Sequence, residues 1–193
     1  KTMNTEQLKE NYFQFFDLFD IDKKTGKLEN NPNIKFVTMP YIGSKYQSSK
    51  EKILFVGMDV GKDETPGRYQ DFTERNINIE VDKGFNPHIA GTYSASLYLL
   101  KEINKWETIW NDFSKFETYS KATKLVHHNN EENPLSYVAL TNLHKFVTIA
   151  RENRAGDLDR KFLNKEIEEN FLLEEIKLFK PDIIFFQGKL PSV

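Results

Sequence analysis

The fold is decided by the stretch Lys52-Ile53-Leu54-Phe55-Val56-Gly57-Met58-Asp59-Val60-Gly61. A continuous apolar run that leads into a glycine-rich turn predicts a buried strand of an α/β sheet. Such sheets hold their ligands at the carboxyl ends of the strands, so we expect Asp59 at the mouth of a crevice. Glycine at positions 57 and 61 would let the backbone approach a ligand closely. The alternative is that Asp59 only caps the next helix, and this motif alone favours neither interpretation.

Two further stretches predict strands of the same sheet. Residues 137–141 form the second candidate, which ends at Asn142, and residues 183–186 form the third. A helix predicted over 164–179 lies between them and ends just before a proline. A strand, a crossover helix and a strand in succession indicate a parallel sheet. We therefore expect a single α/β domain with a central, mostly parallel sheet flanked by helices.

Residues 1–50 are expected to pack on this domain, which covers 51–193, as a helical and extended segment. Aromatic and apolar residues at helical spacing predict an amphipathic helix over 5–20, and residues 34–39 predict a short strand. The acidic stretch between them resembles a calcium loop. Its glycine comes one place late and its twelfth residue is Asn31 rather than a glutamate, which excludes that site. Further along, a helix is predicted over residues 93–106.

The composition is that of an ordinary globular protein, with 38% hydrophobic and 29% charged residues among 193. No apolar run approaches the ~20 residues that cross a bilayer, so we expect no membrane partner. The chain has no cysteine, which excludes disulfides, thiolate nucleophiles and cysteine-bound clusters and fits a cytoplasmic protein. A net charge of −2 gives no overall basic field, although a local basic face for nucleic acid stays open.

Three pieces of the chain follow one another in a characteristic order. They are Gly57-Met58-Asp59-Val60-Gly61, Leu140-Thr141-Asn142-Leu143-His144-Lys145, and the helix and strand over 172–188. Together they resemble the uracil-DNA glycosylase superfamily over roughly residues 52–190, and most closely its branches with a Gly-x-x-Pro-Gly first motif and a Thr-Asn-x-x-Lys strand end. The resemblance implies a three-layer α/β/α fold and a monomeric DNA glycosylase without cofactor or metal. Its DNA partner would present a flipped uracil or modified pyrimidine, whose N-glycosidic bond is hydrolysed.

The resemblance also implies roles for individual residues. Asp59 takes the place of the residue that positions the water attacking the sugar C1′, and a carboxylate suits the oxocarbenium-like transition state. Asn142 matches the strand-end asparagine that reads the Watson–Crick edge of the base, because an amide offers both a donor and an acceptor. The alternative for Asn142 is a turn residue that bonds its own backbone. The other residues of the first motif expected to bind substrate are Gly57, Met58 and Gly61.

Stacking and phosphate contacts follow from the same resemblance. Pro87-His88-Ile89-Ala90-Gly91 is similar to the family's Pro-Phe-Val-Gly stretch, whose aromatic residue stacks on the base. His88 would take that role, with Phe85 as the alternative. Phosphate contacts, which weaken with salt, would come from three basic residues, Lys62, Arg68 and Lys145. For each of them the alternative is a solvated surface side chain.

The chain departs from the family pattern at several points. Val60 replaces the proline of the first motif, and the cysteines that often bind an iron–sulfur cluster in these branches are absent. The second catalytic motif, His-Pro-Ser or Asn-Pro-Ser, should follow one more helix and strand after Gly188, whereas the sequence ends at Val193. This implies a fragment, incomplete at its C-terminus, or an incomplete enzyme. Gly61 replaces the tyrosine that excludes 5-methyl groups in the uracil-specific branch, which predicts a pocket that accepts substituted pyrimidines.

Two other functions stay open. One is a non-catalytic nucleic-acid or nucleotide-binding module on the same scaffold. The other is an unrelated doubly wound protein that binds a small phosphorylated ligand at Gly57–Gly61, since a fold does not dictate a function. The sequence argues against the phosphate-binding function, because a true phosphate loop carries more glycines than Gly57–Gly61 and usually ends in Lys-Ser/Thr.

Overall fold

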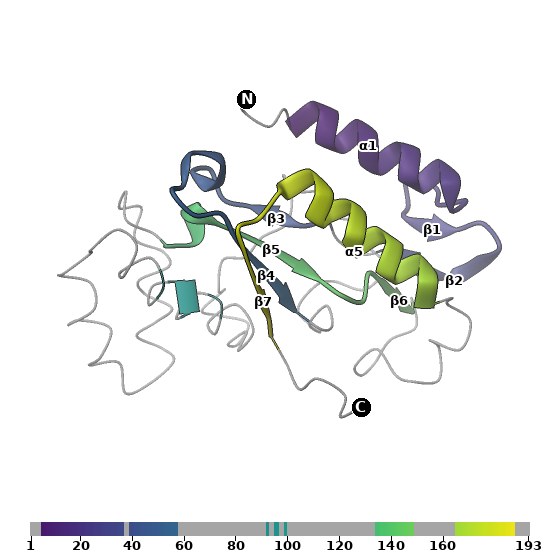
Figure 1. The fold of residues 1–193 in the computed structure, drawn as a ribbon. Helices are drawn as coiled ribbons and strands as arrows, with labels where there is room; N and C mark the ends of the chain where they lie inside the picture. Colours follow the sequence, from purple (N-terminus) through teal and green to yellow (C-terminus); the bar gives the residue numbers. More distant parts are fainter. Residues whose placement is uncertain are drawn as a thin grey trace, which may run out of the picture.

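The structure is a computed structural model, and it describes residues 5–36, 39–57, 92, 95–96, 99, 134–148 and 165–187. It contains helices and strands in an α/β arrangement (Figure 1). The helices are α1 (Thr5–Leu18) and α5 (Lys165–Phe179), with short 3-10 helices η1 (Tyr46–Ser48) and η2 (Pro134–Tyr137). The strands are β1 (Lys27–Leu28), β2 (Asn31–Phe36), β3 (Tyr41–Ile42), β4 (Ile53–Gly57), β5 (Val138–Asn142), β6 (Phe146–Thr148) and β7 (Ile183–Phe186). Among these described residues, no helix has the length and apolar character required to cross a membrane.

The main sheet has the strand order β3-β5-β4-β7. β4 pairs in parallel with both β5 and β7, and β3 pairs antiparallel with β5 at the edge. The central strands β4 and β5 are buried along their whole length, as expected for continuous apolar runs covered on both faces. The three predicted strands and their parallel pairing are therefore confirmed, within a mixed sheet in which α5 forms the connection into β7.

A second, smaller sheet joins the N-terminal segment to the main domain. It has the antiparallel order β1-β2-β6 and was not predicted. β2 begins at Asn31 and ends at Phe36, so the strand predicted over 34–39 starts earlier than expected. Pro32 is tolerated because the pairing of β2 with β6 begins only at Ile34, so its missing N–H is not needed there. Residues 1–50 thus supply β1, β2 and β3 as well as α1.

Helix α1 packs along α5 on one side of the main sheet (Figure 1). Phe171 is the centre of this contact, with ring centroids 6.3 Å from Phe16, 5.4 Å from Phe19 and 5.6 Å from Phe146. The predicted helix over 5–20 is confirmed, although it ends at Leu18, and the left-handed backbone of Asp20 (φ 53°) follows directly. The predicted helix over 93–106 is described at three positions, all helical: Ala95, Ser96 and Leu99. The full three-layer arrangement stays a prediction.

Candidate functional site

The carboxyl ends of the three parallel strands meet at one edge of the main sheet. Gly57, the last residue of β4, lies in register with Asn142, the last residue of β5. The next backbone N–H, that of Leu143, donates to the carbonyl oxygen of Gly57 at 2.7 Å. On the other side of β4, the N–H of Gln187 donates to the carbonyl oxygen of Val56 at 2.8 Å. Gly57 therefore lies between two amide residues, Asn142 at the end of β5 and Gln187 directly after β7.

The side chains of Asn142 and Gln187 belong to the same face of this sheet. Thr141 faces α5, because its hydroxyl donates to Glu175 at 2.6 Å. Successive strand residues point to opposite faces, so Asn142 faces away from α5. On β4 and β7, Val56 and Ile184 pack in the core cluster with α5 residues, whereas Phe55 and Phe185 stack on each other with centroids 5.6 Å apart. By the same alternation, Gln187 lies on the Phe185 face, away from α5.

A helical segment that contains Thr92 approaches this face. The Thr92 hydroxyl donates to Oε1 of Gln187 at 3.0 Å, and the Ser96 hydroxyl donates to the Thr92 carbonyl oxygen at 2.6 Å. Both Thr92 and Ser96 are fully buried. In Figure 1 this teal segment lies on the other side of the strands from α5. Sequence analysis missed Gln187 and Thr92, although a polar residue directly after the third predicted strand was a signal for the first.

Lys145 has a different environment from the one predicted. Its side chain is 1% exposed, and its ammonium lies 2.5 Å and 2.6 Å from the two carboxylate oxygens of Glu175. It also donates to the Thr141 hydroxyl, and the Tyr12 hydroxyl donates to Glu175 at 2.6 Å. The structure thus corrects the prediction that Lys145 contacts DNA phosphates: its charge is held in the interior by a paired carboxylate. We call Lys145, Glu175, Thr141 and Tyr12 the buried network.

A second acidic residue of α5 holds the chain just beyond β5. Glu168 is 6% exposed; its Oε2 lies 2.9 Å from Nδ1 of His144, and its Oε1 accepts the backbone N–H of Lys145 at 3.2 Å. Sequence analysis missed both Glu168 and Glu175. The signal was present, because the two glutamates lie seven residues apart, on the same helix face as Phe171 and Phe179. The strand end that carries Asn142 is therefore fixed to α5.

Several predicted site residues lie outside the described part of the chain. They are Met58, Asp59, Gly61, Lys62, Arg68, Phe85 and His88. Their roles stay predictions. Gly57 and Asn142 are described, and the structure brings these two together at the sheet edge. Asn142 is 1% exposed.

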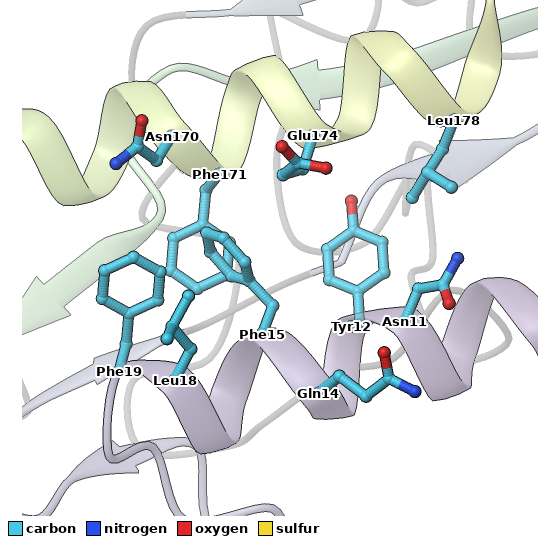
Figure 2. A pocket seen from close by; sticks show the side chains of 10 residues that line it. All are labelled: Asn11, Tyr12, Gln14, Phe15, Leu18, Phe19, Asn170, Phe171, Glu174 and Leu178. Carbon is cyan, nitrogen blue, oxygen red and sulfur yellow. The ribbon is translucent and has the colours of Figure 1, made fainter.

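A groove of about 540 Å³ lies between α1 and α5 (Figure 2). Its wall combines the rings of Phe15, Phe19 and Phe171 with polar side chains such as Gln14 and Asn170. The groove lies on the α5 side of the sheet, whereas Asn142 and Gln187 face the other way. Within the described ranges, no group of three or more potential metal-ligating side chains is close enough to hold an ion.

The site can thus be described as a glycine flanked by two amides, at the carboxyl edge of a parallel sheet and over a stacked aromatic pair. Carboxyl edges of this kind are the usual ligand sites of α/β sheets. A fold of this class supports many functions, so the chemistry has to be inferred from the site itself. Comparisons of the chain with models of protein families, with curated proteins and with solved structures find no match.

Proposed function

We propose that the protein acts as a DNA glycosylase that hydrolyses the N-glycosidic bond of a flipped uracil or substituted pyrimidine. One observation carries the proposal: Gly57, which opens the Gly57–Gly61 motif, lies in register with Asn142 at the carboxyl edge of the sheet. A motif suited to water activation and an amide suited to base recognition are thereby next to each other. The helical residues near Thr92, on the face opposite α5, are consistent with a three-layer arrangement around this edge.

The distances allow one nucleotide to contact both proposed residues. Asp59 follows Gly57 by two positions in the chain, so their Cα atoms lie no more than about 7 Å apart. Neighbouring strands lie about 4.8 Å apart, which places Gly57 and Asn142 within that distance. A base held by Asn142 would therefore have its sugar within reach of the Asp59 carboxylate.

The proposed reaction is a hydrolysis in which C1′–N cleavage leads to an oxocarbenium-like sugar. The base leaves with the bonding electron pair, and water adds its oxygen to C1′ while a proton passes to the Asp59 carboxylate. The carboxylate also stabilises the positive charge that develops on the sugar. The Asn142 amide binds the polar edge of the departing base. Phosphate contacts are assigned to Lys62 and Arg68 only, since Lys145 is buried.

The proposal is tested by base excision with the whole chain. Duplex and single-stranded oligonucleotides would carry uracil, hypoxanthine or 5-substituted pyrimidines, and abasic sites would be detected by alkaline strand cleavage. We expect excision of at least one pyrimidine, lowered about 10²- to 10⁴-fold in Asp59→Asn, the range of a lost general base. Asn142→Asp should lower excision as well, because it exchanges the donor of the amide for a second acceptor. Asp17→Asn, which changes an exposed carboxylate of α1, is the matched control.

The outcomes separate the proposal from its alternative. Excision that depends on both Asp59 and Asn142 would support the glycosylase. Oligonucleotide binding without excision of any base would favour a non-catalytic nucleic-acid-binding module instead. Excision that Asp59→Asn leaves unchanged would refute the assigned mechanism.

A further inference from the structure

We infer that the groove between α1 and α5 binds an amphipathic, positively charged helix of a protein partner (Figure 2). The two helices that form it run antiparallel. Phe19 at the end of α1 packs on Phe171 near the start of α5, with ring centroids 5.4 Å apart, whereas Tyr12 donates to Glu175 one turn further along α5. The groove lies on the α5 side of the sheet and the candidate site on the other side, so this inference does not depend on the proposed function.

The groove exposes apolar side chains that the fold does not cover. Phe15 and Phe19 are only half-buried there, and Leu18 beside them is 72% exposed, more than any other large apolar side chain in the described part of the chain. The polar side chains of Gln14 and Asn170 border these apolar groups (Figure 2). A contiguous apolar surface with a polar border is typical of a protein-binding site.

The dimensions of the groove suit a helix. On α1 its wall extends from Asn11 to Phe19, which corresponds to about 12 Å along the helix axis. Apolar anchors at positions i, i+3 or i+4, and i+7 of a bound helix cover about 10.5 Å, so three of them fit side by side. A bound helix also satisfies its own backbone hydrogen bonds, whereas an extended peptide would leave its N–H and C=O groups without partners against the helical wall.

The charge of the two helices favours a basic partner. α1 carries three acidic residues and one basic residue, and α5 carries five acidic and two basic residues. The chain as a whole has only two more acidic than basic residues, so the acidic excess is concentrated on these helices and the remainder is slightly basic. An acidic groove repels nucleic acid and attracts a lysine-rich or arginine-rich surface.

One carboxylate of the groove wall is placed to receive a charge of the partner. Glu174 lines the groove and is half-exposed, and its contact with Lys177 at 2.6 Å is a surface ion pair within α5. Exposed pairs of this kind contribute little to stability. A lysine or arginine of the bound helix can therefore compete with Lys177 for Glu174 at little cost.

The inference is tested by binding of designed peptides to the whole chain, measured by fluorescence anisotropy. The probe is a fluorescein-labelled peptide of about 14 residues with leucines on one helical face and lysines elsewhere. The first comparison peptide has the same composition with leucine and lysine alternating, which favours a strand, and the second has glutamate in place of lysine. We expect the basic helix to bind at least about 10-fold tighter than either of them, and to gain helical circular dichroism on binding.

Two groove variants and two controls locate the binding site. Leu18→Gln should weaken binding of the basic helix about 5- to 10-fold, as for the loss of one apolar anchor. Glu174→Lys should weaken the basic helix and strengthen the glutamate peptide. The matched controls are Leu173→Gln, an exposed leucine of α5 that does not line the groove, and Glu29→Lys in the turn after β1, and both should bind like the unmodified chain. All four side chains are exposed, so the variants should fold, which their circular dichroism checks.

Three outcomes would overturn the inference. The first is equal affinity for the three peptides, or binding of none of them. The second is binding of the basic helix that Leu18→Gln and Glu174→Lys leave unchanged. The third is dimerisation of the whole chain in sedimentation velocity that Leu18→Gln abolishes, because the groove would then be occupied by a second copy of the chain.

Discussion

The buried network gives the most specific stability prediction. Lys145 and Glu175 are each only 1% exposed in their side chains, and their closest atoms lie 2.5 Å apart. Removing one partner of such a pair leaves an uncompensated charge in the interior, which costs about 3–5 kcal/mol. We therefore expect Lys145→Met and Glu175→Leu each to lower the free energy of unfolding by about that amount.

The double substitution Lys145→Met with Glu175→Leu should cost much less than the sum of the two. Replacing both charges by apolar groups of similar size is often neutral or even stabilising. The hydroxyls of Tyr12 and Thr141 lose their acceptor on Glu175, at about 1 kcal/mol each. The expected total is about 2 kcal/mol, whereas the two single costs add up to at least ~6 kcal/mol, so the coupling energy of the cycle should be at least ~4 kcal/mol.

Urea unfolding followed by circular dichroism measures all four corners of this cycle. With an m-value of about 2 kcal/mol/M, each single substitution should lower the midpoint by about 1.5–2.5 M. The control is the exposed pair Lys177–Glu174, whose atoms are equally close at 2.6 Å but whose side chains are 68% and 49% exposed. Its coupling should stay below about 0.5 kcal/mol. Additive effects at Lys145 and Glu175, or single costs under about 1 kcal/mol, would refute the reasoning.

Three further predictions concern other parts of the fold. A Cβ on Gly43 would lie 2.5 Å from the carbonyl oxygen of Leu135. Gly43→Ala should therefore lower the free energy of unfolding by about 1–3 kcal/mol and lower the melting temperature. Ser44→Ala, at an exposed neighbouring site, should leave the melting temperature unchanged. Burial, together with the nearby Lys27, lowers the pKa of Lys35 to about 8. Between pH 8 and 10 the unfolded chain therefore binds more protons than the folded chain, so the free energy of unfolding should rise with pH over this range. Urea titrations should show this rise in the unmodified chain and not in Lys35→Met. Burial raises the pKa of Tyr41 to about 12. A pH titration followed by absorbance near 295 nm should therefore show a tyrosine that ionises well above pH 10, and this step should be absent in Tyr41→Phe. Ionisation of Tyr41 near pH 10 would contradict the prediction.

Local patterns in the sequence were sufficient for the long elements of the fold. The apolar run before Gly57 predicted β4, and the apolar run Ile183–Phe186 predicted β7. The helical spacing of apolar residues and the following proline predicted α5 within one residue at its start. The apolar pattern of each of these elements predicts it, because their apolar residues are buried in the same hydrophobic core.

The short strands were not predictable in the same way. β1, β3 and β6 have two or three residues each, too few to show a period, and they are strands because of the partners that they meet. β3 pairs with β5 across nearly a hundred residues of chain, at Tyr41 and Leu140. Such pairing depends on the tertiary fold, which a local pattern does not contain.

The strand end at Thr141-Asn142 explains why the candidate site was predicted only in part. Both residues were recognised as one motif, but alternation along β5 sends them to opposite faces. Thr141 joins the buried network through Glu175, while Asn142 lies beside Gly57 on the face that Gln187 shares. Lys145, four residues further on, belongs with Thr141 in the interior rather than with the ligand. A motif interpreted as one binding unit is therefore divided between stability and recognition, and only the alternation of faces along the strand tells the two apart.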